Sequence, residues 1–110
     1  MSSHMTVAAV LLAVVNGQRA MRHEPVLRSV PRIAVCDESS SPPECVRRHG
    51  LRASFAGVIT AWGTSSPRTM VQAWLRSPPH RAIMLDPRYR VAGAYVGHDF
   101  GRVVFGSASE

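Results

Sequence analysis

Apolar residues recur every three or four positions in two stretches of the chain. The first stretch begins after Thr6, a suitable N-cap residue, and Gly17 is expected to mark its frayed end. Its apolar stripe comprises Val7, Val10, Leu11, Val14 and Val15. The second stretch begins at Pro67, directly after Ser66, and its stripe comprises Met70, Val71, Trp74 and Leu75. The spacing predicts one amphipathic helix in each stretch.

Shorter helices are predicted from their boundary residues. The segment from Ser29 to Pro31 is a start signal for a helix that turns Ile33, Ala34 and Val35 inward. "SSSPPECVRRHG" has an acid in the first turn, basic residues in the last and a glycine to end the helix, which complements the helix dipole. Ser77, followed by two prolines, begins another helix that ends at Asp86.

Extended segments are predicted between and after these helices. "LRASFAGVITAWG" is rich in β-branched and aromatic residues, and it is expected to be a strand or extended connection that ends at Gly63. "VAGAYVG" and "RVVFG" flank the turn-forming letters "HDFG". This pattern predicts an antiparallel hairpin near the end of the chain.

Length and composition indicate one compact unit. The chain has 110 residues, of which 45% are hydrophobic, enough for a single core. We expect a single domain over residues 6–110, preceded at 1–5 by a start and a cloning remnant, "MSSHM". The formal net charge is +6, but all thirteen basic residues are arginines, scattered without an aromatic-interleaved stripe. A nucleic-acid partner is therefore not expected, and the sequence carries no signal for oligomeric state.

Cys36 and Cys45 flank the acidic segment "DESSSPPE". A disulfide between them would close a short loop and imply an oxidising compartment, while two free thiols remain the alternative. The cysteines form no CxxC pair and no Cys/His cluster at the usual zinc spacing, so a structural metal is not expected. The apolar run "TVAAVLLAVV" is too short to span a bilayer and lacks the flanks of a signal peptide, so no transmembrane segment is predicted.

His80 is the main candidate for chemistry. It can serve the first turn of its helix by bonding nearby backbone, act as a general acid or base, or bind an anion together with Arg81. Ser77 lies three residues earlier, but no nucleophile motif surrounds it and no acid is spaced to orient the imidazole. His49, at a helix end, is expected to complement the helix dipole.

Several motifs resemble the CAP superfamily of cysteine-rich secretory, antigen five and pathogenesis-related proteins, especially its bacterial SCP-like branch. The family pattern "VVQ.WM.SPGHRANIL.P.Y..IGVG" is similar to residues 71–93, and "LLAVVNGQRA" and "RVVFG" resemble the family's opening and closing segments. The resemblance covers nearly the whole chain. It implies an α+β fold, a three-layer α/β/α sandwich with helices on both faces of an antiparallel sheet.

The resemblance breaks where the family carries its metal-binding pocket. The family segment "GENIA.G" corresponds to "GVITAWG" here, so Val58 stands where the acid would be. A second family histidine falls in a segment replaced by "CDESSSPPECVRRHG". Only His80 is carried over, and one imidazole does not hold zinc. We therefore expect a shortened, divergent member without a metal or other cofactor.

The function expected from these features is binding of a small apolar molecule or a protein partner. Family members are described as binding sterols and other lipids, which favours an apolar ligand. The candidate ligand-binding residues are Ser77, His80, Arg81, Trp62, Trp74 and Tyr95. The aromatic residues are also natural core residues. The alternative is an enzyme that reuses the family cavity, with His80 as the catalytic acid or base on a small metabolite. An extracellular location follows from the resemblance, and a cytoplasmic one if no export signal exists.

Overall fold

The computed structural model describes residues 5–39 and 41–107, and its centre is a sheet with strand order β1-β3-β4-β2. The strands are β1 (Arg28–Ser29), β2 (Ala56–Trp62), β3 (Val91–Val96) and β4 (Phe100–Gly106). The helices are α1 (Val7–Met21), the 3₁₀ helix η1 (Pro31–Val35), α2 (Pro42–Arg48), α3 (Pro67–Arg76) and α4 (Pro78–Met84). Residues 1–4 of the expected cloning remnant lie outside the described residues.

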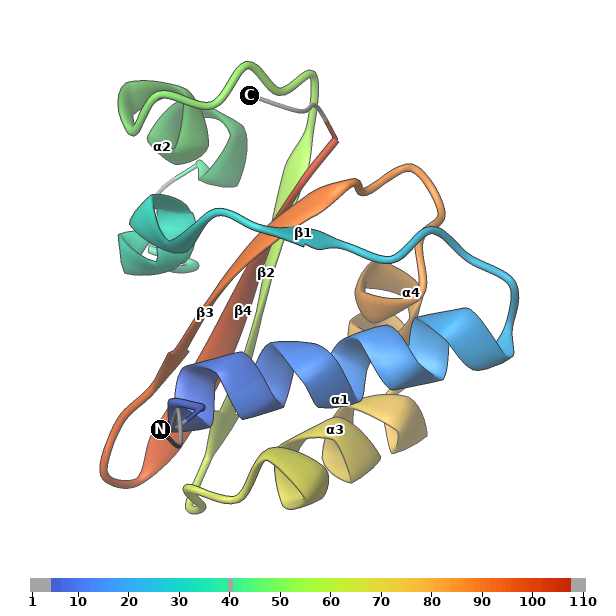
Figure 1. The fold of residues 1–110 in the computed structure, drawn as a ribbon. Coiled ribbons are helices and arrows are strands. Elements are labelled where there is room, and N and C mark those ends of the chain that lie inside the picture. The colour runs from blue at the N-terminus through green and yellow to red at the C-terminus, as the bar shows by residue number, and fades with distance from the viewer. Residues whose placement is uncertain (1–4, 40, 108–110) are drawn as a thin grey trace, which may run out of the picture.

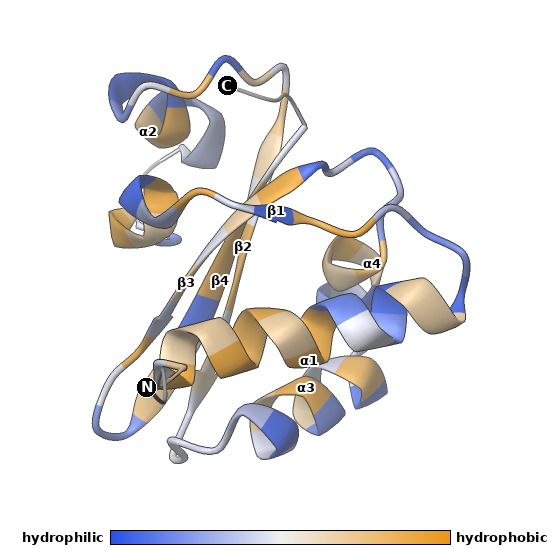
Figure 2. Cartoon of the chain, viewed as in Figure 1, coloured by the Kyte–Doolittle hydropathy of each residue, from blue (hydrophilic) through white to orange (hydrophobic). Residues whose placement is uncertain are grey.

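Helices cover both faces of the sheet. Helices α1, α3 and α4 pack on one face, while η1 and α2 pack on the other (Figure 1). Alternation along β4 supplies both cores, because Val103 and Phe105 join the first cluster and Val104 joins the second. Figure 2 shows hydrophobic residues along the sheet and α1, with many hydrophilic residues in the connections. The predicted α+β sandwich is confirmed.

The sheet is mixed. β4 pairs antiparallel with both β2 and β3, as the hairpin pattern predicted, but the two-residue β1 pairs parallel with β3. The hairpin turn is shorter than "HDFG" suggested. Phe100 and Gly101 belong to β4, and Phe100 faces Trp62 across the sheet. β2 likewise begins only at Ala56, later than the sequence pattern indicated.

Two local expectations about the helices were wrong. Gly17 does not end α1, which continues to Met21. A glycine in a helix interior costs only about 0.5–1 kcal/mol, which tertiary contacts of the following residues offset. Val35 does not turn inward, since 59% of its surface is exposed, whereas Ile33 and Ala34 are buried. The N-caps at Thr6 and Ser66 are present, and each side-chain oxygen accepts a backbone N–H of its helix.

Arg19 anchors the far end of α1, although nothing in the sequence pattern singled it out. Its side chain is fully buried. The guanidinium donates to the backbone carbonyls of Pro25 (2.8 Å), Met84 (2.9 Å), Asp86 (2.9 Å) and Tyr89 (3.1 Å). Burial lowers the pKa of this guanidinium, but an arginine stays charged in proteins. One side chain thus joins α1 to the connection before β1 and to the connection between α4 and β3.

No helix in the described part of the chain combines the length and hydropathy that a membrane span needs.

Candidate functional site

The structure distributes the six candidate ligand-binding residues over three places. Trp62 and Tyr95 lie on an exposed part of the sheet. Ser77, His80 and Arg81 lie at the start of α4. This helix packs on the face of the sheet opposite to the one that carries Trp62 and Tyr95. The sixth residue, Trp74, is 2% exposed, and its Nε1 donates to the carbonyl of Thr60 at 3.1 Å. Trp74 is therefore a core residue, and its link to the start of α4 is through the backbone, since the Ser77 N–H donates to the Trp74 carbonyl at 3.2 Å.

An aromatic surface forms at the hairpin end of the sheet. We define it by Trp62, Tyr95, Phe100 and Arg102. The rings of Trp62 and Phe100 stack with centroids 4.9 Å apart, and those of Tyr95 and Phe100 are 5.4 Å apart. Trp62 is 75% exposed and Tyr95 45% exposed. Phe100 thus contacts both other rings, and the three rings together present a continuous apolar area to solvent.

Strand register explains why these residues share one face. Trp62 pairs with Phe100, and Tyr95 pairs with Arg102. Phe100 and Arg102 are two residues apart on β4, and the next residue on the same face is Val104, which packs in the cluster under η1 and α2. In Figure 1, η1 and α2 lie at one end of the sheet and the β3–β4 hairpin at the other. The aromatic surface therefore continues the second core beyond the helices that cover it.

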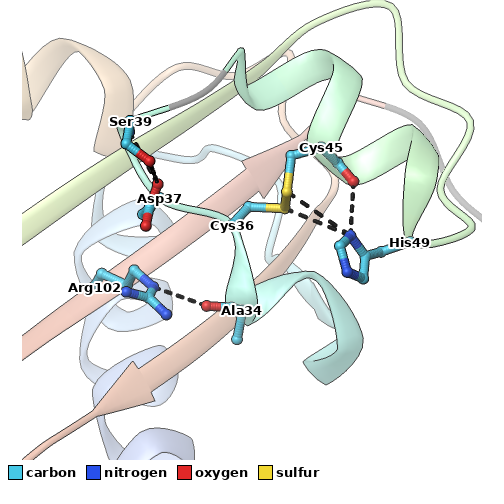
Figure 3. The surroundings of a disulfide bond; sticks show 7 residues. All are labelled: Ala34, Cys36, Asp37, Ser39, Cys45, His49 and Arg102. Atoms are coloured by element: carbon cyan, nitrogen blue, oxygen red, sulfur yellow. Dashed lines mark hydrogen bonds between the residues drawn. A yellow bond between two sulfur atoms is a disulfide. The ribbon is translucent and has the colours of Figure 1, made fainter.

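Arg102 joins this surface to the covered part of the sheet. Its Nε donates to the carbonyl of Ala34 in η1 at 2.8 Å, as Figure 3 shows. Its guanidinium carbon lies 5.3 Å from the ring centroid of Tyr95 and 5.9 Å from that of Phe100. These are cation–π distances. Arg102 thus stiffens the aromatic surface and adds a positive charge at its edge.

The structure brings Ser77 and His80 together at the start of α4. Ser77 Oγ lies 2.7 Å from His80 Nδ1, and the Ser77 side chain makes no capping bond to the helix. His80 is partly exposed. Arg81 is one of the residues that line an open depression of about 500 Å³, together with Pro78, Ala82, Leu85, Asp86 and Pro87. The arrangement offers a serine–imidazole pair beside solvent, and within the described part of the chain no third group forms a hydrogen bond with the imidazole.

The position of Val58 bears on the expected loss of the family pocket. Val58 is buried in the cluster under η1 and α2, whereas α4, which carries His80, packs on the other face of β2. An acid at position 58 would thus point away from His80. No group of three potential metal ligands within residues 5–39 and 41–107 includes His80.

Cys36 and Cys45 form a disulfide, which settles the alternative that the sequence left open. Their Cα atoms are 5.9 Å apart, and the bond ties the end of η1 to α2 (Figure 3). Both side chains are buried in the second core.

Solved structures with the same arrangement identify the fold. An extracellular protein containing an SCP domain from Bacillus anthracis superposes with a TM-score of 0.80 over 97% of this chain, at 18% identity. The chain has the SCP fold. A cysteine-rich secretory protein from Staphylococcus aureus shares it, with a TM-score of 0.78, 93% coverage and 18% identity. This chain spans only 45% and 39% of those two proteins.

An outer surface protein from Borrelia burgdorferi has the SCP fold over its entire length. It superposes with a TM-score of 0.79 over 99% of this chain and 100% of its own, at 16% identity. No protein-family model and no curated protein matches the sequence. The likeness at these identities concerns the fold, the one that the resemblance to the CAP superfamily implied.

Sequence reasoning found two of the aromatic residues but missed Phe100 and Arg102. Phe100 was assigned to the turn, and Arg102 was treated as one of many scattered arginines. The signal that finds them is strand register. Once β4 begins at Phe100, alternate residues place Phe100 and Arg102 on the face that carries Trp62.

Proposed function

We propose that this protein is a shortened, divergent SCP-domain protein that binds a small apolar ligand on the aromatic surface. The observation that carries the proposal is the contact of Trp62, Phe100 and Tyr95 rings in an exposed position. Contiguous exposed aromatic area is costly in water and typical of binding sites. The apolar ligand expected from the family resemblance matches this chemistry.

The size of the exposed rings sets the affinity to expect. A tryptophan or tyrosine side chain buries about 150–250 Å² when fully covered. A ligand that covers about 200 Å² here and buries an equal area of its own gains about 10 kcal/mol, at about 25 cal/mol per Å². Loss of translational and rotational freedom costs at least about 4 kcal/mol. The remaining 6 kcal/mol or so corresponds to a Kd on the order of 10–100 µM.

The catalytic alternative has one observation in its favour, the 2.7 Å contact between Ser77 Oγ and His80 Nδ1. A serine activated by histidine needs a third group that holds the imidazole and a set of donors for the developing oxyanion. Ser77 is the one hydrogen-bond partner that His80 shows in the described residues. The aromatic surface therefore supports binding better than the α4 start supports catalysis.

The compartment of this function is the cell exterior. The three similar structures are named as extracellular, secretory and outer-surface proteins. The Cys36–Cys45 disulfide fits the same assignment, because disulfides persist in oxidising compartments.

Calorimetric titration with palmitate and with cholesterol in dilute detergent tests the proposal. The wild-type protein should bind one of them, and the double variant Trp62→Ala/Tyr95→Ala should weaken that binding at least tenfold. His80→Ala is the matched control and should bind as the wild type does. Binding that depends on His80 and not on the aromatic pair would overturn the proposal, as would the absence of binding to both lipids.

A further inference from the structure

A second chemical cluster lies at the end of α2, apart from the aromatic surface. Cys36 follows η1, Cys45 lies in α2 and His49 is the C-cap of that helix. Their potential ligand atoms, two sulfurs and one imidazole nitrogen, lie within 4.8 Å of one another (Figure 3). Within residues 5–39 and 41–107 these are the histidine, cysteine or acidic side chains that come together in a group of three.

We propose that Cys36, Cys45 and His49 form a zinc site once a dithiol has reduced the disulfide. The reductant supplies two electrons and two protons, so the disulfide becomes two thiols and the dithiol becomes a disulfide. Zinc then displaces the two thiol protons and binds both thiolates together with the imidazole. Sulfur and imidazole nitrogen are the ligands that zinc favours in proteins.

The distances already approach those of a tetrahedral centre. His49 Nδ1 lies 4.0 Å from Cys36 Sγ and 3.8 Å from Cys45 Sγ. Zinc bonds of about 2.3 Å to sulfur and 2.0 Å to nitrogen place a sulfur and a nitrogen ligand roughly 3.6 Å apart, and two sulfur ligands roughly 3.8 Å apart. The nitrogen thus needs to move by a few tenths of an ångström. The main change is the separation of the sulfurs after the S–S bond breaks.

The local backbone holds two of the ligands in place. Cys45 and His49 are four residues apart at the end of one helix, which puts their side chains on the same face. His49 Nδ1 lies 2.9 Å from the Cys45 carbonyl and must carry a hydrogen there, because a carbonyl only accepts. Metal binding requires that hydrogen to move to Nε2 and the ring to turn, so that the Nδ1 lone pair faces the ion and not the carbonyl. The carbonyl keeps a partner, since the backbone N–H of His49 also donates to it at 3.2 Å.

Exposure of the cluster is one-sided. The two cysteines are buried, while His49 is partly exposed, so an ion reaches the cluster from the side of the imidazole. Three protein ligands leave a fourth position for water or another small ligand. The spacing of the ligands, eight residues between the cysteines, differs from the short repeats of zinc fingers. The fold, through the loop between η1 and α2, brings the cysteines together instead.

Cobalt binding tests the proposal, because Co²⁺ reports its ligands by colour. The full chain is reduced with dithiothreitol, freed of it by gel filtration without oxygen, and titrated with Co²⁺ and then Zn²⁺. We expect one equivalent of Co²⁺, a thiolate-to-cobalt charge-transfer band, and d–d bands with the intensity of a tetrahedral site. Zinc should displace the cobalt. The oxidised protein should show none of these signals.

Variants separate the proposed site from adventitious thiol binding. His49→Ala should weaken Co²⁺ binding by at least tenfold, because even the outer partners of metal ligands contribute about 10- to 100-fold. His80→Ala should bind as the wild type does. Circular dichroism checks each reduced sample. The proposal is overturned if the reduced, folded protein binds no Co²⁺ or if His49→Ala binds it equally well. It is also overturned if the reduced protein is unfolded and metal does not restore its structure.

Discussion

Replacement of Arg19 by alanine should be among the most damaging single changes in this fold. Arg19 makes four hydrogen bonds to backbone carbonyls and has no exposed surface. A hydrogen bond that involves a charged group contributes about 1.5–3 kcal/mol, so the set contributes about 6–12 kcal/mol. Burial of the guanidinium costs several kcal/mol in the wild type, and the variant no longer bears that cost. The expected net loss of unfolding free energy is about 3–5 kcal/mol.

Urea unfolding followed by circular dichroism measures this loss. A domain of this size has a total stability of about 5–15 kcal/mol, so the Arg19→Ala midpoint should fall sharply. Arg22→Ala is the matched control at the end of the same helix, because among the described residues the Arg22 side chain donates only to Gln18 of α1. It should change stability by no more than about 0.5 kcal/mol. A loss below about 1 kcal/mol for Arg19→Ala would refute the interpretation of Arg19 as an anchor.

Three further predictions concern stability and use the same unfolding assay. Gly17→Ala should stabilise by about 0.5–1 kcal/mol, because Gly17 lies inside α1 and the added methyl group meets no described atom within 4 Å beyond its chain neighbours and the backbone of its own helix. Gly93→Ala should instead destabilise by about 1–3 kcal/mol, because its methyl group would lie 2.7 and 2.8 Å from two backbone atoms. Equal changes in the free energy of unfolding for the two glycine variants would contradict these two predictions. Serine at both cysteines should cost about 2–3 kcal/mol, the loop entropy of a disulfide over about ten residues, and a dithiol should then leave the midpoint unchanged. Trp74→Ala should cost about 3–5 kcal/mol and Trp62→Ala less than about 1.5 kcal/mol, and the reverse order would exclude Trp62 as a surface residue.

The helices could be predicted from the sequence because their signals are local. Ser66 and Pro67 mark the start of α3 by capping chemistry that does not depend on the rest of the fold. The prediction that α1 ends at Gly17 was wrong because the continuation of α1 depends on residues that are distant in the sequence. Asn16 exchanges hydrogen bonds with the backbone of Leu27, and Arg19 binds the connection after α4. Such long-range bonds leave no pattern in the sequence around a helix end.

In the candidate site, too, local relations could be predicted from the sequence and long-range ones could not. Ser77 and His80 come together because they are three residues apart at the start of one helix, a local relation. Trp62 and Tyr95 lie on strands that never pair directly, and Phe100 between them completes the aromatic surface. The partners of an exposed ring on a sheet are set by strand order and register. Neither quantity can be obtained from one strand's sequence.

Tryptophan fluorescence during titrations with palmitate and with cholesterol tests the proposed binding surface most directly. The chain has two tryptophans, of which Trp62 is exposed and Trp74 is buried. Emission from Trp62 should shift to shorter wavelength as the lipid excludes water from its ring, with a midpoint on the order of 10–100 µM. Trp62→Phe keeps an aromatic ring in place and should abolish the shift, while His80→Ala should retain it. A wild-type spectrum that changes with neither lipid, or a shift that survives in Trp62→Phe, would contradict the assignment of ligand binding to the aromatic surface.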